Sequence, residues 1–355
     1  MSSSRQYKVA AAQLDCVFYD AQANLAKILE AIEEAATNGA RVVVFSELAL
    51  SGYPFHIWAL PYHEQLPYIR SFYTTASVAA DGPESAALSA ACKLHKIRAV
   101  VGFSERDGGS LFMSQFIVGP DGDVVVRRKL RPTSMERIVY GEGDGSDLKV
   151  HDTELGRVGV LQCWEHAQPL VKYAMASQHE QLHCASWPVF PAQLPHHSLS
   201  QAGNSAILTT YAIETSTYVV SASSFFTQQN LDKIFGDKEQ GLTLGGGYTA
   251  ILDPEGRTLV QAAPDKREII YADIDLDLCY QAKSVLCPVG HYSRQDVFQV
   301  SFDTTPRHHI RAGPHHAAPS SGPFRQSRAQ LFGETTSASA GPGELKVEEA
   351  ESRES

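Results

Sequence analysis

Apolar and polar positions follow two patterns along the chain, and the patterns mark strands and helices in turn. Short continuous apolar runs rich in β-branched residues are typical of buried strands. Apolar residues spaced three or four positions apart, as in Leu25, Ile28 and Ile32, are typical of amphipathic helices. The runs predict strands over 7–12, 41–45, 97–103, 157–161, 183–186, 218–222 and 268–276. The spaced patterns predict helices over about 25–36, 83–96, 170–177 and 206–215.

Two hairpins interrupt this alternation of strands and helices. Residues 119–122 read Gly-Pro-Asp-Gly, a strong turn signal between the apolar runs 111–118 and 124–128. A second hairpin over 248–261 turns at Asp-Pro-Glu-Gly. Strand–helix repeats broken by hairpins build mixed sheets that helices cover, so we expect an α/β fold and not a purely parallel barrel.

The character of the chain changes after about residue 304. Residues 305–355 lose the apolar periodicity and are rich in Ser, Gly, Ala, Glu and Pro. Such a composition cannot bury enough apolar surface to offset the entropy of ordering. We therefore predict one folded domain over 1–304 and a disordered, low-complexity tail over 305–355. The paired histidines of the tail have no cysteine or carboxylate at ligand spacing, so no metal site is predicted there.

Charge and composition exclude several classes of partner. The formal net charge of -10 argues against nucleic acid and anionic membranes, because neither surface attracts an acidic protein. The polar N-terminus lacks the apolar core of a signal peptide, and no stretch approaches about 18 uninterrupted apolar residues. The six cysteines are scattered without a CxxC pair, so neither a disulfide framework nor a zinc site is suggested. We expect a cytoplasmic protein with reduced thiols.

Three reactive side chains each stand first after a buried strand: Glu47, Lys129 and Cys163. Taken singly, Glu47 could cap a helix, Lys129 could be a solvated charge and Cys163 could be a small core residue. Strand ends are also where functional groups converge on a pocket, and these three supply a base, a cation and a soft nucleophile. Cys163 is predicted on a tight strand-to-helix turn, where a helix N-terminus can lower the pKa of a thiol. The set suits acyl-type chemistry.

The motifs around these residues resemble those of the nitrilase superfamily and, within it, nitrilases proper. The glutamate motif is Phe45-Ser46-Glu47, and the lysine motif runs from Arg128 and Lys129 to Glu136. The cysteine motif is Cys-Trp-Glu-His over 163–166. Further similarity lies at 52–58, 141–143 and 290–294, and the resemblance covers about residues 7 to 303.

The resemblance implies an αββα sandwich that pairs through its outer helices into a four-layered αββα–αββα homodimer, which extends into larger spiral homo-oligomers. It implies no metal and no organic cofactor. It also implies a small-molecule nitrile substrate, which Cys163 attacks to give a thioimidate and then a thioester. In this scheme Glu47 is the base, Lys129 stabilises negative charge with the backbone N–H of Trp164, and Glu136 orients Lys129.

Five residues near these motifs are candidate substrate contacts. They are Tyr53, Trp164, Glu165, His166 and Trp187, and they suggest an aromatic-lined site for arylaliphatic or aliphatic nitriles. Trp58 could equally be a core residue.

Other activities fit the same residues less well. An amidase or carbamoylase would use the same glutamate, lysine and cysteine, and a cyanide hydratase would stop at the amide. A catalytically idle assembly protein is a further alternative, against which the intact residues argue.

Overall fold

Two β-sheets pack face to face in the computed structural model, which describes residues 5–190, 196–235 and 244–307. The first sheet has the order β13 (Glu268–Asp275), β1 (Gln6–Gln13), β2 (Ala40–Val44), β3 (Arg98–Asp107), β4 (Ser110–Val118) and β5 (Val124–Arg128), with β6 (Tyr140–Gly141) beside β4. The second has the order β12 (Thr258–Gln261), β11 (Ala250–Leu252), β10 (Tyr218–Ala222), β9 (Leu182–Ser186), β8 (Gly156–Gln162) and β7 (His151–Thr153).

Both sheets mix parallel and antiparallel pairs. In the first sheet β1, β2 and β3 are parallel, while β3–β4, β4–β5 and β1–β13 are antiparallel. In the second, β8, β9 and β10 are parallel and the outer pairs are antiparallel. The prediction of mixed sheets is confirmed. The candidate residues Glu47, Lys129 and Cys163 follow shortly after the ends of β2, β5 and β8, respectively.

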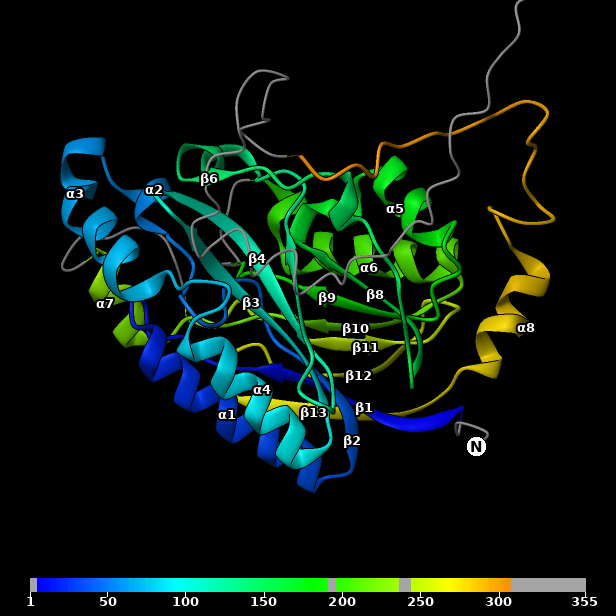
Figure 1. The fold of residues 1–355 in the computed structure, drawn as a ribbon, viewed down its shortest axis with the longest axis horizontal. Coiled ribbons are helices and arrows are strands. Elements are labelled where there is room, and N and C mark those ends of the chain that lie inside the picture. The colour runs from blue at the N-terminus through cyan, green and yellow to red at the C-terminus, as the bar shows by residue number, and fades with distance from the viewer. Residues whose placement is uncertain (1–4, 191–195, 236–243, 308–355) are drawn as a thin grey trace, which may run out of the picture.

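Alternation along each strand divides the core into layers, because successive side chains of a strand point to opposite faces. Val42 and Val44 pack between the sheets, against residues such as Val160, whereas Val43 packs outward. Helices α1 (Ala21–Thr37) and α4 (Pro83–His95) cover the first sheet, and α5 (Pro169–Ala176) and α6 (Gln201–Thr215) cover the second (Figure 1). The order of layers is αββα, as predicted.

Local sequence sets where the covering helices begin. Asp20 caps α1 by accepting a hydrogen bond from the Ala23 N–H at 3.0 Å, and Ser200 caps α6 in the same way. Pro83 and Pro169 open α4 and α5, where a missing N–H has no partner to lose.

Several elements were not predicted from the apolar pattern. They are α2 (His56–Ala59), α3 (Tyr62–Ser71), a π-helical turn (Phe72–Ala76), α7 (Gln228–Phe235), α8 (Asp277–Val285) and the 3-10 turns Ser134–Ile138, Gly145–Asp147, Cys163–Ala167 and His197–Leu199. Helix α3 contains Pro67 and buries only Gln65, so it has no apolar stripe for a pattern to detect.

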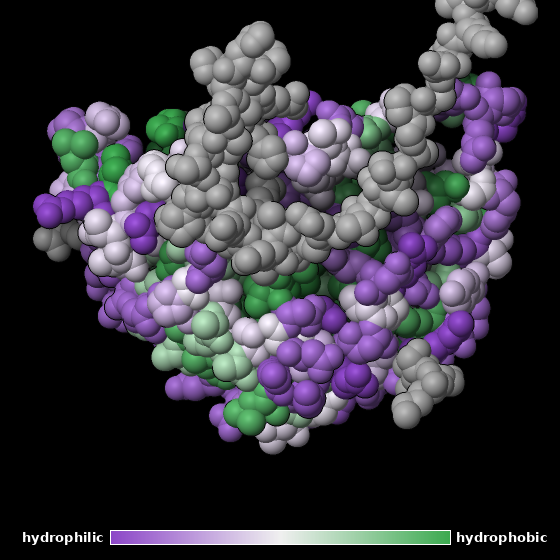
Figure 2. Space-filling model, in the orientation of Figure 1, coloured by the Kyte–Doolittle hydropathy of each residue, from purple (hydrophilic) through white to green (hydrophobic). Residues whose placement is uncertain are grey.

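Much of the surface in Figure 2 is hydrophilic, with smaller apolar groups between the polar residues. None of the helices in the described ranges is long and apolar enough to cross a membrane. The predicted tail, 305–355, lies outside the described residues beyond Arg307.

Candidate active site

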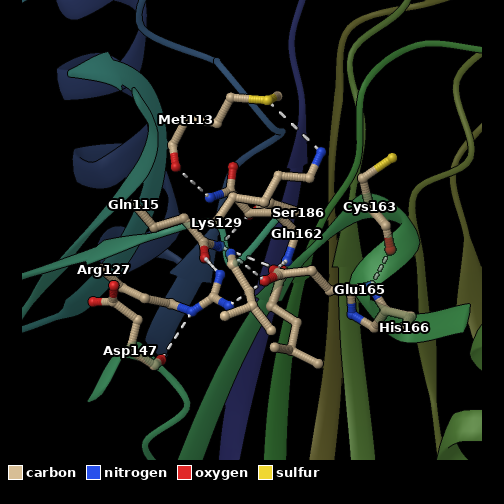
Figure 3. Close-up of polar contacts among 12 residues, drawn as sticks. Met113, Gln115, Arg127, Lys129, Asp147, Gln162, Cys163, Glu165, His166 and Ser186 are labelled. Carbon is tan, nitrogen blue, oxygen red and sulfur yellow. Dashed lines mark hydrogen bonds and ion pairs between the residues drawn. The ribbon is translucent and has the colours of Figure 1, made fainter. Parts of the chain in front are cut away.

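The structure brings a buried ammonium group between two buried carboxylates. Lys129 Nζ lies 2.8 Å from Glu47 Oε1 and 2.9 Å from Glu136 Oε2, and all three side chains are almost fully shielded from solvent. Cys163 belongs to the same site, because its thiol interacts electrostatically with the three charged groups. Figure 3 shows its sulfur and the Lys129 ammonium on the same side of the site. The residues singled out at three strand ends therefore meet.

The backbone of Glu47 is fixed by contacts with two neighbouring strands, β9 and β3. Its N–H donates to the Trp187 carbonyl at 3.1 Å, which fixes the turn after β2 against the end of β9. Gly102 in β3 lies against this turn so closely that only a glycine fits there. Of the Glu47 carboxylate, Oε1 faces Lys129, while Oε2 is buried and has no hydrogen-bond partner among the described residues. One oxygen is thus free for a reacting proton.

Lys129 is equally constrained. Its N–H donates to the Met113 carbonyl at 2.7 Å, and its own carbonyl accepts from the Gly143 N–H at 2.8 Å. The sulfur of Met113 lies 3.7 Å from Lys129 Nζ. A side chain at Gly143 would meet the carbonyl oxygens of Arg128 and Lys129, so this glycine permits the close approach.

Glu136 stands on a 3-10 turn that closes over Lys129. Its Oε2 accepts from the Thr133 N–H at 2.6 Å as well as from Lys129. Its Oε1 accepts from the Tyr53 hydroxyl at 2.8 Å, and the Trp58 indole N–H donates to that hydroxyl at 3.1 Å. The hydrogen bond from Tyr53 therefore holds the Glu136 carboxylate in place. Trp58 is about half exposed at this edge of the site and is not a core residue.

Burial and charge shift the pKa values in this cluster. Burial, opposed by Lys129 and reinforced by Glu136, raises the pKa of Glu47 to about 8. Burial alone would lower the pKa of Lys129, but the carboxylates of Glu136 and Glu47 hold it well above its usual value. The site therefore combines a permanent ammonium with a carboxylate whose proton affinity suits general base catalysis near neutral pH.

Cys163 occupies a strained turn at the end of β8. Its φ of +50 is unusual for a residue with a side chain, and the 3-10 turn Cys163–Ala167 follows directly. Burial, and then the charge of Glu47, raise the pKa of the thiol well above its ordinary value, although Lys129 and the Trp164 N–H lower it. The expectation of a lowered thiol pKa is therefore wrong. The thiol is protonated in this site, and a base must take its proton.

Glu165 lies on the same turn as Cys163, and its side chain extends toward Arg127 (Figure 3). Its Oε1 accepts from Arg127 Nη2 at 2.6 Å and from the Leu130 N–H at 2.8 Å. Its Oε2 accepts from the Gln162 N–H at 2.8 Å. The carboxylate ties the backbone on either side of Cys163 to the backbone beside Lys129, so this geometry favours positioning and not substrate contact.

The same buried network extends between the two sheets. Arg127 Nη1 donates to Gln115 Oε1 at 3.2 Å, and Gln115 Nε2 donates to the Ser186 hydroxyl at 2.9 Å. Ser186 in turn donates to the Phe45 carbonyl at 2.8 Å, two residues before Glu47. Hydrogen bonds thus connect the ends of the strands that carry the three candidate residues, which favours a preorganised site.

His166 and Trp187 pack against each other in the apolar cluster that includes Cys163. The ring of His166 stacks on that of Trp187 at 5.1 Å, and His166 Nδ1 lies 2.5 Å from the Cys163 carbonyl oxygen. Burial, and then the neighbouring His183, hold the pKa of His166 well below its usual value. Both nitrogens of His166 face protein groups, so the structure gives it no free atom for a substrate. Trp164 and Trp187 each keep an indole N–H without a partner among the described residues.

Sequence reasoning missed the buried polar residues that support the site, chiefly Gln115, Arg127 and His183. A signal was available, because each is a polar residue within a mostly apolar strand, and all three positions are buried. Arg127 lies two positions before Lys129, and Gln115 pairs with it across β4 and β5. Buried polar residues need partners: Arg127 donates to Gln115, and His183 pairs with His166 and Glu180.

All six cysteines of the chain are unpaired and buried. In the part of the chain that the structure describes, no group of three or more His, Cys, Asp or Glu side chains is placed to hold a metal ion.

Comparison with known proteins identifies relatives over most of the chain. The family model described as carbon-nitrogen hydrolase matches residues 8–284. An aliphatic nitrilase from Rhodococcus rhodochrous is 43% identical over 310 residues, which cover 84% of each chain. An arylacetonitrilase from Aspergillus kawachii is 40% identical and covers 87% of this chain and 95% of its own.

Solved structures share the fold. A carbon-nitrogen hydrolase from Helicobacter pylori matches with a TM-score of 0.65 and 18% identity, over 83% of this chain and 98% of its own. The C. elegans NitFhit protein matches with a TM-score of 0.64 and 18% identity, over 84% of this chain and 67% of its own. The αββα layers, the matched residues and the extent of identity agree, and the chain belongs to the carbon-nitrogen hydrolase family, with nitrilases among its relatives.

Proposed function

We propose that this protein is a nitrilase that hydrolyses organic nitriles to the carboxylic acid and ammonia, with Cys163 as nucleophile. The strongest support is the arrangement of charged groups around Lys129. Lys129 Nζ is held between Glu47 and Glu136 beside a cysteine on a strained turn, and Glu47 Oε2 is left without a partner among the described residues. Relatives named aliphatic nitrilase and arylacetonitrilase support it.

The first step forms a carbon–sulfur bond. Glu47 accepts the thiol proton of Cys163, and the sulfur attacks the nitrile carbon, which is a soft electrophile. One π bond of the nitrile opens, and its electron pair moves onto nitrogen. Lys129 and the Trp164 N–H stabilise the charge as it develops, and the nitrogen then takes a proton. The product is a thioimidate on Cys163.

Hydrolysis follows in two further stages. Glu47 activates a water that adds to the thioimidate carbon, giving a tetrahedral species that carries sulfur, oxygen and nitrogen. Protonation of the nitrogen lets ammonia leave, and a thioester remains. A second water adds to the thioester, the acid leaves and the thiol of Cys163 takes back a proton. Two waters are consumed for each nitrile. Glu136 holds Lys129 in place throughout, through the 2.9 Å contact.

The substrate class is proposed from the aromatic groups around the site. Tyr53, Trp164 and Trp187 come from three different segments, and an apolar aromatic wall suits arylaliphatic or aliphatic nitriles. The printed names of the relatives include both classes. Glu165 and His166 take part by positioning Cys163 and not by touching the substrate.

Assembly is proposed from the outer helices. Leu170 on α5 and Ile213 on α6 are large apolar residues that are 68% and 42% exposed, on helices that cover the second sheet. Exposed apolar residues on such a face favour a homodimer in which α5 and α6 meet their copies, with larger homo-oligomers built from it. A cytoplasmic location remains part of the proposal, on the composition alone.

A panel of nitriles and the matching amides tests the function. Purified protein is incubated with each compound, and ammonia, acid and amide are measured together. The proposal predicts acid and ammonia in equal amounts from at least one nitrile, at rates above those for the amide. Amide as the main product would identify a hydratase, and turnover of amides alone would identify an amidase. The Cys163→Ala variant, which should release no ammonia, controls for contaminating activity.

A further inference from the structure

A chain of buried polar side chains leads from Cys163 into the layer between the second sheet and α6. His166 Nδ1 lies 2.5 Å from the Cys163 carbonyl oxygen, and His166 Nε2 lies 2.8 Å from His183 Nε2. His183 Nδ1 lies 2.6 Å from Glu180 Oε1, and the Tyr211 hydroxyl donates to Glu180 Oε2 at 2.8 Å. Each of the four side chains is almost completely buried.

The carbonyl at one end fixes the direction of both hydrogen bonds made by His166. A carbonyl only accepts, so His166 Nδ1 carries the proton of that contact. The low pKa of His166, caused by burial and then by His183, leaves it neutral, so its Nε2 has no proton and accepts. His183 Nε2 must therefore donate to His166, and His183 Nδ1 faces the Glu180 carboxyl. The tautomer of His166 and a proton on His183 Nε2 follow from these contacts and from the neutral state of His166.

The fold makes room for this chain. Gly159 in β8 stands opposite His183 in β9, and a Cβ on Gly159 would collide with Glu180 Oε1. The rings of His183 and Tyr211 pack with 4.1 Å between their centroids, so this contact places His183 against α6. A buried carboxylate and two buried imidazoles are unfavourable unless they are fully paired, and here each finds a partner.

The accepting carbonyl belongs to the peptide unit whose other end is the Trp164 N–H. A peptide unit is planar, with its C=O and N–H pointing in opposite directions, so a clamp on the oxygen sets the direction of the N–H. That N–H lies toward the sulfur, since it is among the groups that lower the pKa of the Cys163 thiol. A hydrogen bond to a carbonyl also polarises the peptide and strengthens its N–H as a donor.

We propose that His183, held by Glu180 and Tyr211, is a positioning residue that acts through His166 on the Cys163–Trp164 peptide and orients its N–H as an oxyanion donor. The proposal rests on the proposed function, in which that N–H stabilises developing negative charge. It adds to the site three residues, Glu180, His183 and Tyr211, that lie outside the cysteine motif. Their effect should appear in the rate of the chemical step and not in substrate affinity.

Kinetics of two substitutions at His183 test the idea. His183→Leu removes the donor to His166, whereas the amide of His183→Gln can still donate there. We expect His183→Leu to lower kcat about 100-fold, as losing one oxyanion donor does, with KM nearly unchanged. His183→Gln should recover most of the loss. Alkylation of Cys163 by iodoacetamide forms no oxyanion and depends on the Trp164 N–H only through its small effect on the thiol pKa, so its rate should fall much less than kcat. An equal fall of alkylation and turnover would overturn the proposal, because the chain would then act on the sulfur or on the fold.

A matched pair of tyrosines separates position from stability. Tyr211→Phe removes one buried hydroxyl that bonds Glu180, and Tyr7→Phe removes one that bonds the Leu155 carbonyl at 2.7 Å, at the far end of β8 from Cys163. Both should lower thermal stability, but only Tyr211→Phe should lower kcat, by about tenfold for one hydrogen bond. Equal effects on kcat would contradict the proposal.

Nitrogen-15 NMR of the imidazoles reads the chain without any substrate. In the Cys163→Ala protein, which keeps the carbonyl, His166 should be protonated on Nδ1 only and His183 should carry a proton on Nε2. The opposite tautomer of His166 would overturn the proposal even if nitriles are hydrolysed. Absence of nitrile turnover in the wild type, with the expected tautomers present, would instead count against the proposed function.

Discussion

Gly102 in β3 supports Glu47 at a distance that no other residue allows. A Cβ on Gly102 would lie 2.9 Å from Glu47 Cα, and 2.5 Å from the carbonyl oxygen of Ser46. These are backbone atoms, which cannot swing aside as the end of a side chain can. The turn that presents the candidate base is therefore pressed onto the neighbouring strand, and the position of its carboxylate depends on a residue far away in sequence.

Gly102→Ala should displace Glu47 and lower kcat by about 100-fold or more, because misplacing a reacting group by about 1 Å has that effect. Overpacking should also destabilise the fold by about 1–3 kcal/mol. The control is Gly109→Ala in the turn between β3 and β4, where a Cβ would meet nothing within 4 Å. Steady-state kinetics and thermal unfolding of both variants check this. Full activity in Gly102→Ala would show that the site tolerates movement of Glu47.

Glu47→Gln and Lys129→Met should separate the roles of base and cation. Glu47→Gln keeps the shape but cannot take the thiol proton, and Lys129→Met removes the charge that stabilises the developing anion. Each should slow formation of the covalent adduct by a factor of about 100 to 1,000. Rapid-quench mass spectrometry of a single turnover measures that rate. If either variant forms the adduct as fast as the wild type, the role assigned to that residue is wrong.

Activity should rise with pH toward a plateau. With a pKa of about 8, the Glu47 carboxyl is protonated in more acidic solution and cannot accept the proton of Cys163. The value of kcat/KM should therefore fall by about tenfold for each pH unit well below that pKa. Glu136 raises the pKa of Glu47, so the midpoint of the residual activity in Glu136→Gln should move to lower pH. A midpoint that stays fixed or moves up would contradict the assignment of Glu47 as base.

Glu165→Gln should destabilise the protein strongly, by about 3–5 kcal/mol, because it leaves the buried Arg127 guanidinium without its carboxylate. Glu154 offers a matched control, since it pairs with Arg98 at 2.9 Å but is itself partly exposed. Glu154→Gln should cost about 1 kcal/mol or less. Chemical denaturation of both variants measures the difference. Similar losses would mean that the Arg127 pair does not hold the turn of Cys163 in place.

The sequence predicted most of the layered fold and the residues that meet at its centre. Strands such as β2 and β8 are continuous apolar runs that end in a reactive side chain, so both the element and the position of Glu47 or Cys163 follow from one pattern. Which oxygen of Glu47 faces Lys129 does not follow, because it depends on contacts between strands that are distant in sequence.

Closeness to Cys163 in the sequence did not correctly predict which residues contact the substrate site. Glu165 and His166 stand two and three positions after the nucleophile, which suggested substrate contacts. Figure 3 shows the sulfur turned away from both side chains, and hydrogen bonds to buried protein groups hold Glu165 and His166 inside the protein. The hydrogen bonds that link His166, His183 and Glu180 could likewise not be predicted from the sequence, because they depend on the packing of β8, β9 and α6.

The proposed reaction requires a covalent bond between the Cys163 sulfur and the nitrile carbon. The most direct test is mass spectrometry of protein quenched in acid during turnover of a nitrile that it hydrolyses, followed by peptide mapping. We expect an adduct with the mass of the thioimidate or the thioester on the peptide that carries Cys163, and no adduct and no ammonia with Cys163→Ala. Sustained release of ammonia by Cys163→Ala, or an adduct on another residue, would contradict it.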